Sequence, residues 1–384
     1  MKKSLLIVSA LLLSVFNLYP QESGSPELKV KPVGRVLMDA AAYAGNTQGL
    51  FKMGAGIPDV RIGASASYGK WDATVEMGYA NAKVSLQDIY LKYNFNSNNF
   101  LKIGNFIHEY GLQSVTSSSM KCTMEEPTSN NAFSNPRLLG VMFQHSGNHF
   151  FGAASAHVEP NATIMEPTAM GQQGYGLLTR LVWRPIHETG KILQIGVSGA
   201  FSSPKYEKDS EGNQHHLFRF KANFPTRVDK HEALNGVVDH AMNLFQFTPE
   251  LLAAYGPLAL EAQYYYNQVN RRDNLKAYKT QGAYGTLRGL ILGGDYCYQM
   301  NRGGLATPRP KSLEVCLMYN YSTLSDNRIG IHGGRVSDIS CTFNYYINKY
   351  MLCRIRYGFT KRWDLTAAPD IDLSAIQARL QIIF

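Results

Sequence analysis

The sequence feature that most constrains the fold is a period-two alternation of apolar and polar residues, which recurs along the chain and reaches its last residue. In the closing stretch LSAIQARLQIIF, every second residue counted back from Phe384 to Ile376 is apolar, and the residues between include Arg379 and two glutamines. Successive side chains of a β-strand point to opposite faces, so this spacing indicates a strand with one apolar face. We expect the chain to use its terminal aromatic residue structurally.

Comparable alternating stretches appear throughout the chain and are separated by turn sequences such as Tyr68-Gly69-Lys70 and Tyr255-Gly256-Pro257. Amphipathic helical periodicity is scarce. Counting the stretches gives about 16 to 18 candidate strands, most near the ~10 residues that a membrane-spanning strand needs. The clearest examples are residues 60–68, 71–79, 89–95, 218–222, 258–264, 313–319 and 351–357.

Short turns alternate with longer polar stretches, among them residues 107–136, 202–216, 225–243 and 300–311. Strand pairs with tight turns on one side and long loops on the other are typical of an outer-membrane barrel. A secreted soluble β-sandwich or propeller would also alternate, with its apolar face inward. Aromatic residues near strand ends and the terminal Phe384 favour the all-β, transmembrane antiparallel β-barrel. We expect residues 107–136 to fold inward as a constriction loop.

The N-terminal residues 1–20 have the pattern of a secretory signal peptide. Lys2 and Lys3 form a basic start, and an apolar core follows from Leu5 to Phe16. The alternative, a transmembrane helix, needs about 20 apolar residues. Residues 21–384 are therefore the predicted barrel.

The charge balance is basic, with 38 Lys and Arg against 29 Asp and Glu and a formal net charge of +9. Such a balance suggests anionic partners: nucleic acid, anionic lipid or small anions. Basic residues are scattered singly along strand-like stretches rather than clustered, so we expect no nucleic-acid binding. The five cysteines are odd in number and widely spaced. They predict neither a disulfide framework nor a zinc site, and we expect no cofactor.

If the apolar face meets lipid, the opposite parity faces the lumen, and that parity carries more cations than acids. Rings of Arg and Lys are how anion and phosphate pores select their ions. Each cation is either solvated in the lumen or paired with a neighbouring acid, and both alternatives stay open. The predicted pore-lining or anion-binding residues are Arg35, Arg61, Lys102, Arg180, Arg219, Lys221, Arg354, Arg356 and Arg379, with Lys121 from the constriction loop.

Several ordered segments make the chain similar to the phosphate-selective porin family, porins O and P. The segments are VSLQDIYLKY (84–93), LKIGNF (101–106), GLQSVTSS (111–118), PRLLG (136–140), GAYGT (282–286) and NYYIN (344–348). The resemblance implies a homotrimer of 16-stranded barrels in the outer membrane of a Gram-negative bacterium, with Arg-lined anion channels.

Two departures from the family pattern concern charge. Pro58-Asp59 stands where the family often has a basic doublet, and Thr123 to Glu126 reads TMEE where the family's loop usually has Phe-Met-Glu-Arg. These changes leave the barrel pattern intact while they remove cations on which phosphate selectivity would depend.

The predicted function is an outer-membrane diffusion porin that prefers anions, whether phosphate or other small anions. Its expected partners are those anions, outer-membrane lipid and the barrel-assembly machinery, which would read the terminal aromatic. One alternative is a structural or adhesive surface barrel with a plugged lumen. Another is a barrel enzyme such as a phospholipase or protease, but no Ser/His/Asp set supports it, and the His145 to His149 spacing spans a turn. We therefore expect no enzyme activity and no metal.

Overall fold

The computed structural model describes residues 26–80, 83–116, 120–134, 137–158, 174–208 and 214–384. The predicted signal peptide, residues 1–20, lies outside this part of the chain. Within the described ranges, no helix has the length and apolar character needed to cross a membrane.

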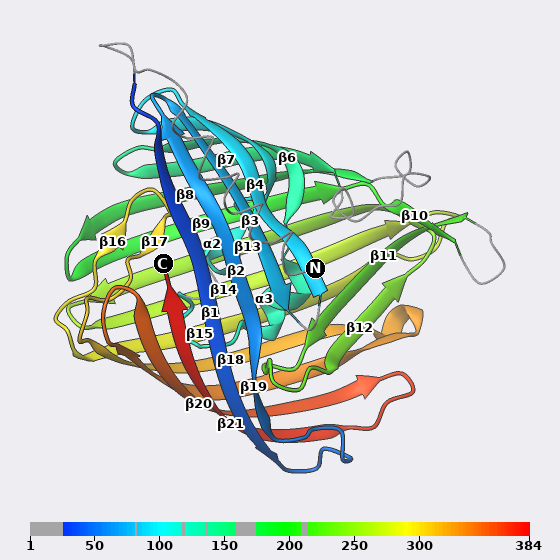
Figure 1. The fold of residues 1–384 in the computed structure, drawn as a ribbon. Helices are drawn as coiled ribbons and strands as arrows, with labels where there is room; N and C mark the ends of the chain where they lie inside the picture. The colour runs from blue at the N-terminus through cyan, green and yellow to red at the C-terminus, as the bar shows by residue number, and fades with distance from the viewer. Residues whose placement is uncertain (1–25, 81–82, 117–119, 135–136, 159–173, 209–213) are drawn as a thin grey trace, which may run out of the picture.

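Sixteen strands form one closed antiparallel barrel, in which each strand pairs with the next and β21 returns to β1 (Figure 1). The all-β barrel predicted from the alternation is confirmed, and its strand number falls at the lower end of the expected range. The barrel strands are β1 (Lys29–Ala44), β2 (Gly54–Tyr68), β3 (Trp71–Ala80), β4 (Lys83–Asn94), β5 (Asn99–Phe106), β6 (Leu138–Ser146), β7 (Phe150–Val158), β8 (Tyr175–Glu188), β9 (Lys191–Ser202), β13 (Ala241–Tyr255), β14 (Leu258–Arg271), β15 (Tyr278–Leu292), β18 (Leu313–Asp326), β19 (Ile331–Tyr346), β20 (Met351–Leu365) and β21 (Ile371–Ile383).

The barrel is apolar outside and polar inside, the reverse of a soluble protein. Leu181 is 62 % exposed on the outer face, whereas its neighbour Arg180 is 0 % exposed on the inner face. The same contrast separates Ile355 from Arg354 and Ile339 from Asp338. Since lipid is the solvent that accepts a continuous apolar surface, this pattern is that of a membrane barrel rather than a sandwich or propeller.

The first and last strands close the barrel at a seam that includes the terminal residue. Gly34 and Phe384 exchange two backbone hydrogen bonds, with N–O distances of 2.8 and 3.0 Å. The Phe384 ring lies directly over Gly34. A Cβ atom added to this glycine would sit only 2.6 Å from the ring, so no larger residue fits without a shift. The terminal aromatic therefore has the structural contact that the alternation predicted.

Deleting Phe384 is expected to lower the yield of folded barrel sharply, because the seam loses both hydrogen bonds and the ring that covers Gly34. The measurement is the fraction of heat-modifiable protein recovered in the outer membrane. Phe384→Tyr is the control, since it keeps the ring and the backbone. Normal folded yield after the deletion would contradict this role for the seam.

The long connection between β5 and β6 enters the barrel, as predicted for residues 107–136. It carries two short helices, α2 (Gly111–Val115) and α3 (Thr128–Phe133). The amide of Gly111 donates to Ser198 Oγ on β9 at 2.9 Å, and that of Ser129 donates to Asn320 Oδ1 on β18 at 3.0 Å. The constriction loop is thus fixed to two separate strands of the inner wall, β9 and β18.

The connection between β9 and β13 corrects one sequence-based expectation. Residues 218–222 were expected to be a barrel strand between two loops, but they lie in a separate three-stranded sheet. Their period-two pattern arises because one face of this sheet packs on the constriction loop. The sheet is made of β10 (Lys205–Lys208), β11 (Gln214–Asn223) and β12 (Glu232–Val238), and lies at one end of the barrel (Figure 1).

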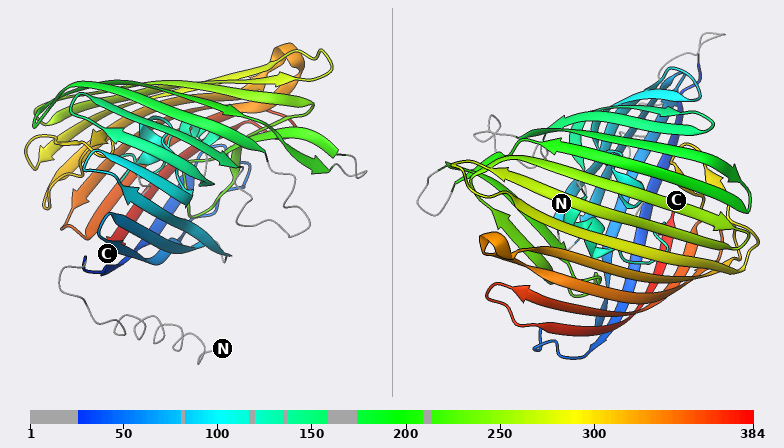
Figure 2. Two further views of the ribbon diagram at one scale, coloured as in Figure 1. Left: turned by 90° about the horizontal axis from the view of Figure 1, so that it is seen from above. Right: turned by 180° about the vertical axis from the view of Figure 1, so that it is seen from behind.

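A second small element lies at the opposite end (Figures 1 and 2). The connection between β15 and β18 contains β16 (Tyr298–Gln299) and β17 (Gly304–Leu305). At the other end, beside β10–β12, η4 (Asn327–Ile329) forms the short link from β18 to β19. Residues 300–311 were expected to be one of the long loops opposite the tight turns. They lie instead on the side of the tight turns, because Gly190 in the β8–β9 turn donates to the Tyr296 carbonyl at 2.8 Å.

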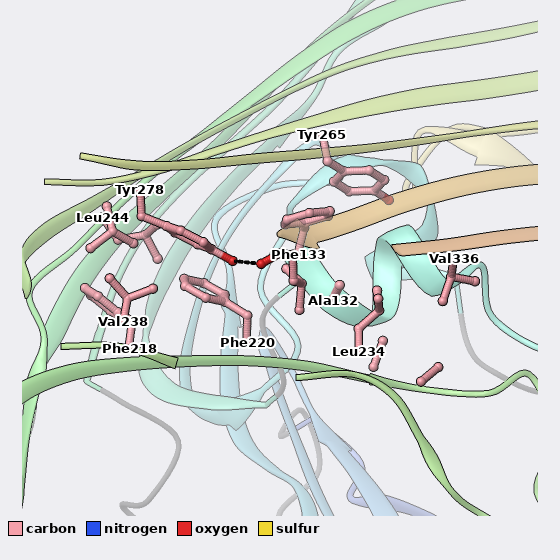
Figure 3. Close-up of a cluster of buried hydrophobic side chains, with 14 of the residues drawn as sticks. Ala132, Phe133, Phe218, Phe220, Leu234, Val238, Leu244, Tyr265, Tyr278 and Val336 are labelled. Atoms are coloured by element: carbon pink, nitrogen blue, oxygen red, sulfur yellow. Dashed lines mark hydrogen bonds between the residues drawn. The ribbon is translucent and has the colours of Figure 1, made fainter. Parts of the chain in front are cut away.

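An apolar cluster fills the end of the barrel beside β10–β12. Phe133 of α3 stacks on Tyr265 of β14, with ring centroids 5.9 Å apart, and Phe220 of β11 stacks on Tyr278 of β15 at 6.1 Å (Figure 3). Leu234 of β12 is 0 % exposed in the same cluster. The constriction loop and the three-stranded sheet are therefore packed together against the inner wall.

Candidate functional site

The inner wall carries a network of ion pairs, which we call the loop network because it joins the barrel to the constriction loop. Arg379 of β21 donates to both carboxylate oxygens of Asp39 at 2.7 and 2.6 Å and to Glu125 at 2.5 Å. Glu125 is a residue of the constriction loop. Burial disfavours its charge, but Arg379 and Arg227 outweigh this effect and hold the pKa of Glu125 below its usual value.

Asp59 is the centre of the second half of the loop network. Its carboxylate contacts Arg35 at 2.5 Å, Arg61 at 3.2 Å and Arg227 at 3.4 Å, and Arg227 also reaches Glu125 at 3.3 Å. One carboxylate thus meets three guanidinium groups. The Pro58-Asp59 departure noted in the sequence therefore puts an acid among cations.

Three more predicted cations belong to the loop network. Arg356 of β20 binds Asp338 with two contacts of 3.2 Å, and Arg354 donates to the Lys121 carbonyl at 2.6 Å. The Lys121 ammonium contacts Glu126 at 2.7 Å. Lys121 is only 4 % exposed, so it lies packed between loop and wall rather than in an aqueous passage.

A second network, the Arg180 network, lies toward the end with β16 and β17. The Arg180 guanidinium binds Glu250 of β13 with contacts of 3.0 and 2.8 Å and Glu109 of the constriction loop at 2.8 Å. It also donates to the Arg302 and Gly303 carbonyls at 3.2 and 2.9 Å. This one side chain therefore connects the wall, the constriction loop and the β15–β18 connection.

The remaining predicted site residues lie elsewhere. Lys102 of β5 faces inward and lies over the rings of Tyr90 and Phe106, 3.9 and 4.4 Å from their centroids. Arg219 and Lys221 are exposed on β11, and Lys221 contacts Glu232 at 3.2 Å. Their assignment to the inner barrel wall is wrong, because β11 is not a barrel strand.

Several inward charged residues were missed. Arg184 of β8 donates to the Met300 carbonyl at 2.6 Å, and Arg288 of β15 contacts Glu314 at 2.8 Å. Each of these two arginines lies on the same strand face as residues that were predicted to point inward, so the alternation could have identified both. Arg227 lies in the β11–β12 connection, where no periodicity marks it.

The interior is closely packed at these residues. Arg180 and Arg356 are 0 % exposed, Arg354 is 1 % exposed and Arg379 is 2 % exposed. The sequence left two alternatives for each cation, solvation in the lumen or pairing with a neighbouring acid. The cations that are paired with an acid are Arg35, Arg61, Lys121, Arg180, Arg356 and Arg379.

Comparison with known families identifies this kind of barrel. The model of the family "Phosphate-selective porin O and P" matches residues 30–384. The chain belongs to this porin family. The porin is accordingly a protein of the outer membrane of a Gram-negative bacterium, and its family and fold indicate a channel rather than an enzyme. No curated protein sequence matches it significantly.

Solved structures support the same fold at low sequence identity. OmpT of Vibrio cholerae is 9 % identical, with a TM-score of 0.58 and coverage of 95 % of this porin and 100 % of OmpT. An anion-selective porin from Comamonas acidovorans is 12 % identical, with a TM-score of 0.56 and coverage of 93 % and 100 %. Pseudomonas putida OprB is 8 % identical, with a TM-score of 0.55 and coverage of 92 % and 94 %.

Proposed function

We propose that this porin is a passive diffusion channel with a modest preference for small anions, phosphate among them. The observation that supports this proposal is that three inward cations bind partners other than carboxylates. Lys102 lies over aromatic rings, Arg184 donates to carbonyl oxygens, and Arg362 donates to the Pro369 carbonyl at 2.5 Å. Positive charge that has no paired acid in the described part of the chain favours anions in a confined interior.

The loop network explains why the proposed preference is modest. It contains seven cations and six carboxylates, an excess of one positive charge. Asp59 and Glu126, which mark the two departures from the family pattern, are both paired with cations. A tight phosphate site needs several cations whose charge converges on one anion. We therefore expect weak phosphate block of the chloride current. The network comprises Arg35, Arg61, Lys121, Arg227, Arg354, Arg356, Arg379, Asp39, Asp59, Glu76, Glu125, Glu126 and Asp338.

In a planar bilayer under a KCl gradient, the reversal potential is expected to have the sign of chloride preference. The preference should weaken as salt rises, because the Debye length falls from about 10 Å at 0.1 M to about 3 Å at 1 M. Arg61→Gln combined with Arg227→Gln should reduce it, since both residues are partly accessible, at 16 % and 19 % side-chain exposure.

The matched control is Lys29→Gln. Lys29 is 64 % exposed at the start of β1 and forms a 3.8 Å ion pair with the equally exposed Glu27. Its loss should leave the reversal potential unchanged. A wild-type channel that prefers potassium would contradict the proposed selectivity, and block of chloride current by micromolar phosphate would contradict the expected weakness of the phosphate site.

The plugged structural barrel is a second candidate, favoured by the packing of both ends. The apolar cluster around Phe133 lies at one end, and Leu112, Leu252 and Tyr296 form a second buried cluster with the β15–β18 connection. The same bilayer experiment separates the two functions, because a plugged barrel inserts without conducting.

We also propose that the porin assembles as a homotrimer, as the family resemblance implies and as OmpT of Vibrio cholerae does in its trimer form. The detergent-solubilised protein is expected to have the mass of three mature chains in native mass spectrometry, each lighter than the 42.8 kDa full sequence by the predicted signal peptide. A population consisting of single chains under conditions that preserve the heat-modifiable barrel would contradict this assembly.

A further inference from the structure

Two of the five cysteines meet inside the barrel, although their spacing along the chain predicts no pairing. Cys122 belongs to the constriction loop and is 2 % exposed, and Cys316 faces inward from β18 and is 1 % exposed. The two cysteine side chains lie close enough to interact in the packed interior. Both are free, as are Cys297, Cys341 and Cys353.

The wall holds the constriction loop in place at this contact. Asn344 Nδ2 of β19 donates to the Cys122 carbonyl at 2.8 Å, and Arg354 Nη1 donates to the adjacent Lys121 carbonyl at 2.6 Å. Cys316 lies opposite Thr342 of β19, two residues from Asn344 along the same inward face. Hydrogen bonds to neighbouring wall residues therefore keep Cys122 beside Cys316.

The location of the porin makes this thiol pair chemically significant. Proteins of the periplasm and cell surface reside where disulfides form and persist. We propose that Cys122 and Cys316 are a site of disulfide formation, which fastens the constriction loop covalently to β18. The proposal goes beyond channel function, because the link can form whether or not the barrel conducts.

The oxidant is a disulfide, that of a periplasmic thiol oxidase, which reaches the two cysteines before the constriction loop is packed inside the barrel. The thiolate of one cysteine attacks the oxidant's disulfide and forms a mixed disulfide, with release of one oxidant thiolate. The second cysteine thiolate then attacks the porin sulfur of that bond and displaces the other oxidant thiolate. Two porin thiols lose two protons and two electrons in total, and the oxidant becomes a dithiol. The reverse exchange with a dithiol reductant releases the loop.

The sequence allows an unambiguous test, because trypsin should place every cysteine in a separate peptide. Cys122 lies in residues 122–137 and Cys316 in residues 312–328. Outer membranes are treated with diamide, blocked with N-ethylmaleimide, and digested without reductant. We expect one cross-linked species of these two peptides, which dithiothreitol resolves, and three maleimide-labelled peptides containing Cys297, Cys341 and Cys353.

Cys316→Ser and Cys122→Ser are the matched variants, and each should lose the cross-linked species while its heat-modifiable barrel remains. A variant in which Cys297, Cys341 and Cys353 are all serine should keep the cross-link. The proposal is overturned if the folded wild-type protein yields maleimide-labelled Cys122 and Cys316 peptides after diamide treatment, or if either cysteine is linked to another partner instead. These results do not depend on conductance, so they stand apart from the test of channel function.

Discussion

Replacing Arg180 with methionine is expected to destabilise the folded barrel by about 3–5 kcal/mol, the usual effect of removing one partner of a buried ion pair. Arg180 is 0 % exposed, and its loss leaves the Glu250 and Glu109 carboxylates buried without their shared cation. The contacts from Arg180 to the Arg302 and Gly303 carbonyls are lost as well. The measurement is equilibrium urea unfolding in lipid vesicles.

The pH dependence gives this prediction a second readout. In the variant, burial of Glu109 without its cation raises the folded-state pKa of this carboxyl group further above the unfolded value of about 4.3. A group whose pKa is raised on folding contributes stability below its unfolded pKa and loses it as pH rises through the folded value. The Arg180→Met barrel should therefore lose stability relative to wild type as pH rises from about 4 to about 8.

Lys221→Met is the matched control. Lys221 also contacts a glutamate, Glu232, but the two side chains are 60 % and 42 % exposed. Exposed ion pairs contribute about 0.2–1 kcal/mol, so this change should be barely measurable and independent of pH over the same range. Equal effects of the two substitutions would contradict the central role of the Arg180 network.

Removing most of the constriction loop is expected to raise single-channel conductance several-fold. Residues 111–134 can be replaced by a short Gly-Ser linker, because Phe106 and Leu138 at the ends of β5 and β6 are paired neighbours. The deletion takes α2 and α3 out of the interior and removes Ala132 and Phe133 from the apolar cluster. A barrel of this strand number without inserted segments encloses an aqueous channel.

The same deletion should increase the preference for anions. It removes Glu125 and Glu126 together with a single lysine, Lys121, so the network loses one more negative than positive charge. Removing residues 273–275 is the control, since they form an exposed connection on the same side of the barrel. Unchanged conductance after loop removal would show that β10–β12 or the β15–β18 connection limits passage instead.

The alternation of the sequence was enough to predict the barrel and which strand faces meet lipid. Lipid on one side and protein on the other impose a period of two on every strand, so Ile355 and Arg354, or Leu181 and Arg180, could be assigned to opposite faces without coordinates. The closing role of Phe384 followed from the same alternation. The constriction loop was also predictable, because residues 107–136 are long, polar and flanked by strands.

The tertiary structure alone decided which alternating segments belong to the barrel. Phe218 and Phe220 alternate with Arg219 and Lys221 as barrel strands do, yet β11 packs on α3. A period of two reports only that one face is buried, and it does not distinguish lipid from a folded loop as the apolar surroundings. For this reason Arg219 and Lys221 were placed wrongly.

Charge pairing and the thiol contact also depended on the fold. Asp59 meets Arg35, Arg61 and Arg227, the last of them 168 positions away, and Cys122 meets Cys316 across 194 positions. Strand register and the path of the inserted loop decide which side chains come within a few ångströms. Parity fixes the face of a residue but leaves its partner open, so the sequence could predict a charged interior without predicting which of its charges are paired.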